Sequence, residues 1–147
     1  MPVEVMGIDH VFIPVRDLAA AEAFYDKVMP ILGFRKGRAS DRVSPRLRYD
    51  NRQFTYWVVL RDGAGSGDSP GAAAHLCFRV VDEQAVDRAA HELRAAGIEA
   101  TEPQAYTQYS DDYYATFFPD PDGLLLEVMN FNTRRRRRMF DWDAEAG

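Results

Sequence analysis

The chain has 147 residues, 46% of them hydrophobic, and a formal net charge of −5. This length suits one packed domain or two small modules that share a core, and the hydrophobic fraction argues against disorder. No apolar run approaches the roughly 20 residues that cross a bilayer, and the negative charge gives no support to general nucleic-acid binding. The single cysteine, Cys77, excludes an intramolecular disulfide and suits a reducing cytoplasm. We therefore expect a cytoplasmic protein with no membrane or nucleic-acid partner.

An internal repeat organises the chain. The segment "HVFIPVRD" at residues 10–17 is similar to "HLCFRVVD" at residues 75–82, and each copy begins with a histidine and ends with an aspartate. Apolar residues at helical spacing follow each copy and predict an amphipathic helix, with Asp17 or Asp82 as its N-cap. Gly33 and Gly97 mark the expected helix ends. The apolar stripes are Ala21, Phe24, Tyr25 and Val28 in the first copy and Val86, Ala89, Ala90 and Leu93 in the second.

Strand-like segments follow each predicted helix. They are "FRKGRA", "RLRYD" and "FTYWVVL" in the first half, and "IEATEP", "YYATFF" and "LLLEVMNF" in the second. The sequence "DPDG" at residues 120–123 predicts a tight turn, and "RDGAGSGDSPGAAA" predicts a linker. We expect one domain over residues 1–147, made of two β-α-β-β-β modules. Module one spans about 7–62, the linker about 63–72, module two about 73–131, and a C-terminal tail 132–147.

Side chains of a strand alternate between the two faces of a sheet. In both histidine strands one face is purely aliphatic, which suits packing under a helix. The other face holds the histidine among mixed neighbours, as expected of a surface that lines a cavity. The aliphatic residues are Val11, Ile13 and Val15, and Leu76, Phe78 and Val80; the mixed faces hold His10, Phe12 and Pro14, and His75, Cys77 and Arg79.

The candidate metal ligands are His10, His75 and Glu127. Glu127 lies within the apolar run "LLLEVMN", where an ionised carboxylate is costly unless it is paired or bound to a metal. Two imidazoles and one carboxylate suit a divalent metal ion such as Zn, Fe, Mn, Ni or Co and leave positions open for a substrate. A strand histidine taken alone is more often structural, and Glu127 has an ion pair with an arginine as its alternative. The arginines available for that pair are Arg46, Arg48 and Arg79.

Two further residues receive a structural interpretation. His91 lies on the second predicted helix beside Glu92 and is expected to face solvent. Cys77 is expected to be a small hydrophobe rather than a nucleophile, because no basic neighbour in the sequence would activate it.

The turn at residues 120–123 decides which side chains join Glu127. A two-residue hairpin loop there pairs Thr116 with Glu127. Tyr114 then shares the concave face with Glu127, and it is our candidate for contacting the substrate. Its alternative role is to satisfy a polar group in the core. A one-residue bulge would bring in Tyr113 and Phe117 instead.

Five consecutive arginines occupy residues 134–138, after the last predicted strand and before an acidic tail. Such a run could indicate binding of phosphate or nucleic acid. Local compensation of charge favours a solvated or subunit-contacting tail.

These motifs resemble the vicinal oxygen chelate superfamily, which includes glyoxalases, extradiol dioxygenases, fosfomycin-resistance enzymes, methylmalonyl-CoA epimerases and bleomycin-binding proteins. "GIDHVFIPVRDLAAAEAFYDKVMPILGF" is similar to its first module, and "AAAHLCFRVVD" with "FFPDPDGLLLEVMN" to its second, over about residues 7–131. The resemblance implies an α+β fold in which two βαβββ modules form a half-open mixed β-barrel around a metal, with helices on the convex face. It also implies a homodimer. Each module would supply one histidine to a shared site, built within one chain or across the dimer.

The sequence departs from two branches of this superfamily. Glyoxalases usually add a carboxylate from the last strand of the first module, where this chain has "FTYWVVL". Extradiol dioxygenases usually carry a histidine and then a tyrosine before the turn, where this chain has no histidine and Phe117 at the tyrosine position. We therefore expect a metal-dependent, glyoxalase-like lyase or isomerase that acts on a small oxygenated substrate. The alternatives are a non-catalytic small-molecule binding or resistance protein and an atypical ring-cleaving dioxygenase.

Overall fold

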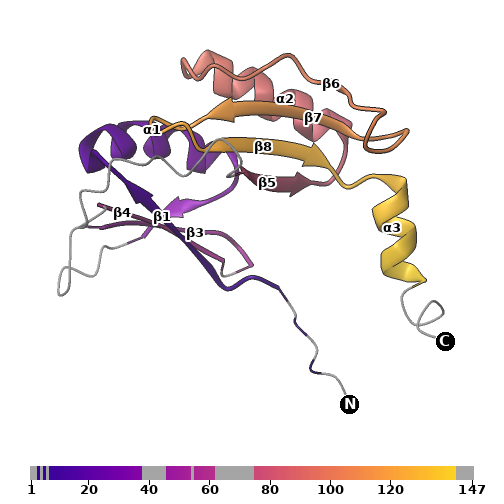
Figure 1. The fold of residues 1–147 in the computed structure, drawn as a ribbon, viewed down its shortest axis with the longest axis horizontal. Coiled ribbons are helices and arrows are strands. Elements are labelled where there is room, and N and C mark those ends of the chain that lie inside the picture. Colours follow the sequence, from indigo (N-terminus) through magenta and orange to yellow (C-terminus); the bar gives the residue numbers. More distant parts are fainter. Residues whose placement is uncertain are drawn as a thin grey trace. The chain divides into compact units, whose positions relative to one another are not determined.

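The structure is a computed structural model that describes residues 3, 5, 7–37, 46–53, 55–61 and 75–141. The predicted linker at about 63–72 and the tail residues 142–147 lie outside the described residues. The chain divides into two compact units, Met1–Asp68 and Ser69–Gly147, each with one four-stranded sheet (Figure 1). Among the described helices, none has the length and apolar character needed to cross a membrane.

The first unit is a βαβββ module. It contains β1 (His10–Val15), α1 (Leu18–Ile31), β2 (Arg35–Lys36), β3 (Arg46–Asp50) and β4 (Tyr56–Arg61). The strand order is β1-β4-β3-β2, with β1 parallel to β4 and the other neighbours antiparallel. The Asp17 carboxylate accepts hydrogen bonds from the N–H groups of Ala19 and Ala20, as predicted for the N-cap of α1. Just beyond the helix, Gly33 has a φ of 82°, in the left-handed region that favours glycine.

The second unit repeats this module and adds a helix. It contains β5 (His75–Val80), α2 (Glu83–Ala95), β6 (Gln104–Ala105), β7 (Tyr114–Pro119), β8 (Leu125–Asn130) and α3 (Thr133–Phe140). The strand order β5-β8-β7-β6 matches that of the first unit, and β5 is again parallel to β8. Asp82 caps α2 by accepting a hydrogen bond from the Ala85 N–H at 2.8 Å. The prediction of an α+β fold made of two βαβββ modules is therefore confirmed, and both sheets are open rather than closed on themselves.

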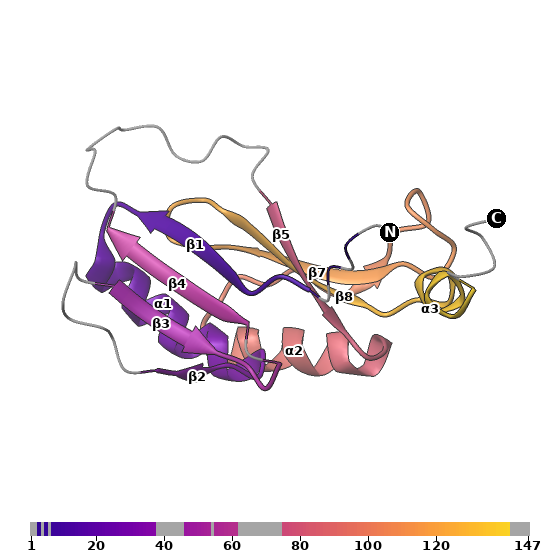
Figure 2. The same cartoon turned by 90° about the horizontal axis from the view of Figure 1, so that it is seen from below.

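In each module the helix packs against one face of its sheet (Figure 2). In β1, Ile13 and Val15 are buried while His10, Phe12 and Pro14 are exposed, so the predicted alternation of faces is confirmed. β5 alternates in the same way, with His75, Cys77 and Arg79 exposed. The buried helix residues are Ala21, Tyr25, Val28 and Met29 in α1, and Val86, Ala89, Ala90 and Leu93 in α2.

The turn between β7 and β8 contradicts the predicted register. The Gly123 N–H donates to the Asp120 carbonyl at 3.0 Å, and the Asp120 N–H donates to the Leu124 carbonyl at 2.9 Å. Gly123 has a φ of 85°. These features define a three-residue loop with a bulge at the glycine, rather than a two-residue loop. Phe117 therefore pairs with Glu127, and the prediction that Thr116 would do so is wrong by one residue.

The first part of the expected C-terminal tail forms a helix, α3. The Asn132 carboxamide oxygen accepts a hydrogen bond from the Arg135 N–H at 3.0 Å, and Asp112 Oδ2 accepts one from the Thr133 N–H at 2.6 Å. These groups satisfy N–H groups that have no partner within the helix. Arginine also has a high helix propensity, which favours a helix over the run. α3 buries none of its residues, as expected of a solvated segment.

Arg136 attaches α3 to the sheet. Its Nε donates to the Phe131 carbonyl at 2.6 Å, and its Nη2 donates to the Val81 carbonyl. The guanidinium lies over the Phe131 ring, 5.2 Å from the ring centroid. These contacts hold the helix beside the ends of β5 and β8.

A buried tyrosine links α1 to the first sheet. Tyr49 on β3 is fully buried, and its hydroxyl donates to Asp26 Oδ1 at 2.7 Å. Lys36 Nζ donates to the other oxygen of Asp26 at 2.8 Å. Desolvation alone would raise the pKa of Asp26, but the hydrogen bonds from Lys36 and Tyr49 outweigh it and hold the pKa below its usual 3.8.

Replacing Tyr49 with phenylalanine keeps the ring and removes this donor. We expect the free energy of unfolding to fall by about 1 kcal/mol at neutral pH. A depressed carboxyl pKa contributes stability above the unfolded-state pKa, and this contribution is lost as the pH falls through the folded-state value. The cost of Tyr49→Phe should therefore shrink at about pH 3. Denaturant unfolding at both pH values measures this, and an equal cost at the two would contradict a role for the Asp26 charge.

Candidate functional site

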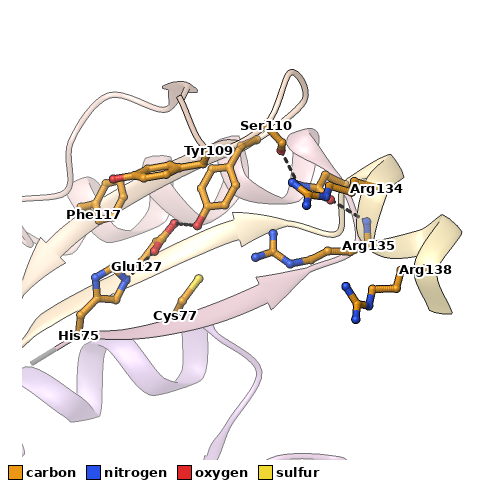
Figure 3. Close-up of a pocket in the computed structure, with 11 residues that line it drawn as sticks. His75, Cys77, Tyr109, Ser110, Phe117, Glu127, Arg134, Arg135 and Arg138 are labelled. Atoms are coloured by element: carbon orange, nitrogen blue, oxygen red, sulfur yellow. Dashed lines mark hydrogen bonds and ion pairs between the residues drawn. The ribbon is translucent and has the colours of Figure 1, made fainter. Parts of the chain in front are cut away.

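The buried carboxylate of Glu127 forms the centre of the candidate site. Its side chain is 1% exposed, although it carries an ionisable group. His75 Nε2 lies 2.6 Å from Glu127 Oε2, and the Tyr113 hydroxyl donates to Oε1 at 2.6 Å (Figure 3). Because a buried charge without partners is strongly destabilising, these two contacts stabilise the carboxylate in place.

The strand pairing brings these groups to one face of the second sheet. Glu127 pairs with Cys77 of β5 on one side and with Phe117 of β7 on the other. His75 lies two residues before Cys77 and so shares its face. Its ring meets the Phe117 ring edge to face, with 6.0 Å between the centroids.

This face opens into a pocket of about 610 Å³, a volume typical of small-molecule sites. All of its lining residues within the described part of the chain belong to the second unit. His75, Cys77 and Glu127 lie at one end of the pocket, and Arg134 and Arg138 of α3 lie at the other (Figure 3).

Two pocket neighbours of Glu127, the Cys77 thiol and the Tyr113 hydroxyl, keep their protons at neutral pH. Desolvation first, and the negative charge of Glu127 second, raise the pKa of Cys77 to about 12. The thiol is therefore no nucleophile at neutral pH, as expected, but it is exposed in the pocket rather than a small hydrophobe of the core. Desolvation and the hydrogen bond to Glu127 likewise raise the pKa of Tyr113, so its hydroxyl remains a donor.

Tyr114 does not join Glu127. Its hydroxyl donates to Asp87 Oδ1 of α2 at 2.8 Å, and this bond is the main reason why its pKa rises to about 12. Thr116 is fully buried, and its hydroxyl donates to the Thr101 carbonyl at 2.7 Å. Both residues thus lie on the helix side of the sheet, because the bulge turns every side chain of β7 over. Tyr113 takes the position that the sequence assigned to Tyr114.

The structure brings two of the three predicted metal ligands together. His10 lies in the first unit, at the exposed start of β1, where its Nδ1 is 2.8 Å from Asp9 Oδ1. Within the described parts of either unit, no three His, Cys, Asp or Glu side chains gather as a metal site. His10 as the third ligand therefore stays a prediction.

His91 and Arg79 do not contact Glu127. His91 is exposed on α2, as expected. Arg79 does not pair with Glu127, because its guanidinium lies over the Phe131 ring at 4.7 Å from the centroid. The oxygens of Glu127 meet an imidazole and a phenol instead.

The sequence interpretation missed the contribution of the arginine run to the pocket. The pocket is lined by Arg134, Arg135 and Arg138. The run had been expected to form a solvated or subunit-contacting tail. The signal in the sequence that predicts this helix is Asn132, a good N-cap residue directly before a run of strong helix formers. Positions 134, 135 and 138 then fall on one side of a helix.

A family model described as the Glyoxalase/Bleomycin resistance protein/Dioxygenase superfamily matches residues 7–128. The chain belongs to this superfamily. The resemblance to vicinal oxygen chelate proteins is thereby confirmed. No curated protein sequence matches the chain.

Solved structures of superfamily proteins share this fold. A putative glyoxalase from Bacillus halodurans is 22% identical, with a TM-score of 0.65 over 84% of this chain and 94% of that chain. A glyoxylase/bleomycin resistance protein/dioxygenase domain from Frankia sp. EAN1pec is 21% identical, with a TM-score of 0.67 over 88% and 95%. A variant of the fosfomycin resistance protein FosX from Listeria monocytogenes, complexed with Mn(II) and 1S,2S-dihydroxypropylphosphonic acid, is 17% identical, with a TM-score of 0.66 over 90% and 98%.

The neighbours Tyr113 and Tyr114 provide a matched test of the site geometry. Tyr113→Phe leaves a buried carboxylate oxygen without its donor, so we expect the free energy of unfolding to fall by about 1.5–3 kcal/mol. Tyr114→Phe removes a solvent-exposed hydrogen bond of a half-buried side chain and should cost less than about 1 kcal/mol. Chemical denaturation of both variants measures the difference. A larger loss in Tyr114→Phe would contradict the assignment of Tyr113 to Glu127.

Proposed function

We propose that this protein is a metal-dependent, glyoxalase-like lyase or isomerase that acts on a small oxygenated substrate. The observation that carries the proposal is the buried Glu127 carboxylate, which faces the His75 imidazole in an open pocket. Membership of the superfamily supports a small-molecule function for this pocket.

The residues present fit a divalent metal ion. The His75 nitrogen and the Glu127 oxygen are 2.6 Å apart, close enough for both to bind one ion. Imidazole and carboxylate donors suit Zn, Fe, Mn, Ni or Co. We propose His10 as the third ligand, on the evidence of the repeated histidine strand. The Mn(II) in the Listeria FosX complex supports this class of metal, since that protein has the same fold.

The protein's own groups would prepare the site for chemistry. When bound, the metal would act as a Lewis acid that stabilises negative charge on a substrate oxygen. Tyr113 is a positioning residue, because its hydroxyl holds Glu127 and its raised pKa preserves the donor. Phe117 packs against the His75 ring and fixes its orientation. His75 itself is 40% exposed, so it remains accessible to an ion from solvent.

Metal binding tests the proposal. We expect His75→Ala and Glu127→Gln to weaken binding of Mn(II) or Zn(II) by at least about 100-fold, because each removes a ligand. His10→Ala should do the same. His91→Ala is the matched control, because it removes an exposed imidazole from α2. Calorimetric titration of metal into the full chain measures these affinities.

The outcomes separate the candidate functions. Unchanged affinity in His75→Ala and Glu127→Gln would refute the metal site. Metal binding without turnover, in a screen of small oxygenated substrates, would instead favour a non-catalytic binding protein. Turnover that requires both metal and Glu127 would support the enzyme.

We further propose that the protein is a cytoplasmic homodimer. In each sheet the histidine strand lies at an edge, and exposed edges need covering. Resemblance to the superfamily supports the same assembly. Light scattering of the purified full chain should give twice the mass of one chain. A monomer at high protein concentration would contradict the dimer.

A further inference from the structure

The arginine run of α3 divides into separate helix faces. Arg134, Arg135 and Arg138 line the pocket that contains Glu127, and they follow the i, i+1, i+4 spacing of one helix side. Arg136 is turned away and binds backbone carbonyls of the sheet. Arg137 lines a neighbouring hollow together with Arg134 and Arg138, but it does not line this pocket. The pocket-facing arginines thus form a defined group within the run.

Arg134 and Arg138 place positive charge at one end of the pocket, and Arg135 reaches from there toward Tyr113 (Figure 3). Glu127 is the one carboxylate among the described lining residues, and it lies at the other end with His75 (Figure 3). Asp111 and Asp112 line the neighbouring hollow. The Asp112 carboxylate accepts hydrogen bonds from the Thr133 N–H at 2.6 Å and from the Ser110 hydroxyl at 3.5 Å, which caps α3.

The arginines repel one another, so their grouping costs free energy. Arg135 is nevertheless held in place, with its guanidinium over the Tyr113 ring at 5.5 Å from the centroid. An oxyanion in the pocket would attract the three guanidinium groups and so offset their mutual repulsion. Guanidinium groups suit that role, because they donate paired, charge-assisted hydrogen bonds to planar or tetrahedral oxyanions.

We propose that Arg134, Arg135 and Arg138 form an oxyanion subsite of this pocket. The ligand class is a small acid that places a carboxylate, phosphate or phosphonate at α3 and its other oxygens near His75 and Glu127. This inference deepens the proposed function by naming the substrate class. The subsite itself consists of residues of the second unit and needs no metal.

The test uses the full chain after metal removal with a chelator. Inorganic phosphate, methylphosphonate and acetate are titrated calorimetrically, with chloride at equal ionic strength as the reference. We expect Arg134→Gln, Arg135→Gln and Arg138→Gln each to weaken oxyanion binding about tenfold, the effect of losing a hydrogen bond to a charged group. Arg137→Gln is the matched control, with the same charge change on the same helix and affinity near that of the wild type. Circular dichroism checks that each variant is folded.

The outcomes of these titrations distinguish a specific oxyanion subsite from a diffuse cationic surface. Binding of any of the three oxyanions, with losses confined to the pocket-facing variants, supports the subsite, and the preferred probe identifies the anionic group. Binding no stronger than that of chloride overturns it. Equal losses in Arg137→Gln, or binding of duplex DNA that depends equally on all four arginines, overturns it in favour of a diffuse cationic surface. Loss of metal binding with intact oxyanion binding would refute the proposed function alone.

Discussion

Burial of the Glu127 carboxylate is the constraint on which the second unit depends. A carboxyl group that is 1% exposed is costly to bury unless both of its oxygens meet polar partners. The strand order β5-β8-β7 meets this need, because β8 lies between two neighbours. His75 reaches one oxygen from β5, and Tyr113, directly before β7, reaches the other. A carboxylate on an edge strand would lack a neighbour on one side.

The identity of the second partner depends on a distant turn. The left-handed Gly123 inserts a bulge into the hairpin, and this bulge sets which residue of β7 faces Glu127. Asp120 supports the turn, since its buried carboxylate accepts hydrogen bonds from the N–H groups of Asp122 and Leu124. The polar environment of the pocket is therefore controlled from the far end of two strands. Local turn chemistry, rather than the pocket residues, decides between Tyr113 and Tyr114.

The features that could be predicted from the sequence are those that depend on short-range patterns. The two caps Asp17 and Asp82, the apolar helix stripes and the repeated module all follow from spacing within one element. Glu127 could be recognised as a candidate site residue, because it is an isolated acid among apolar neighbours in the sequence. The strand register was not, because Asp-Pro-Asp-Gly fits loops of two lengths, and only the backbone conformation of Gly123 distinguishes them. α3 was missed because the arginine run was interpreted by its charge rather than by its helix propensity.

The three-residue loop also makes the pocket sensitive to the residue at position 123, which lies outside it. If a residue that disfavours the φ of 85° replaced Gly123 and the same chain closed as a two-residue loop, with Asp120 opposite position 123, β7 would slide by one position against β8 and each of its side chains would change faces. Tyr114 would then approach Glu127, and Tyr113 would pass to the side of α2. No pocket residue would have been substituted. Variation at this position of the hairpin is thus a route by which related chains could acquire different pocket chemistry on an unchanged scaffold.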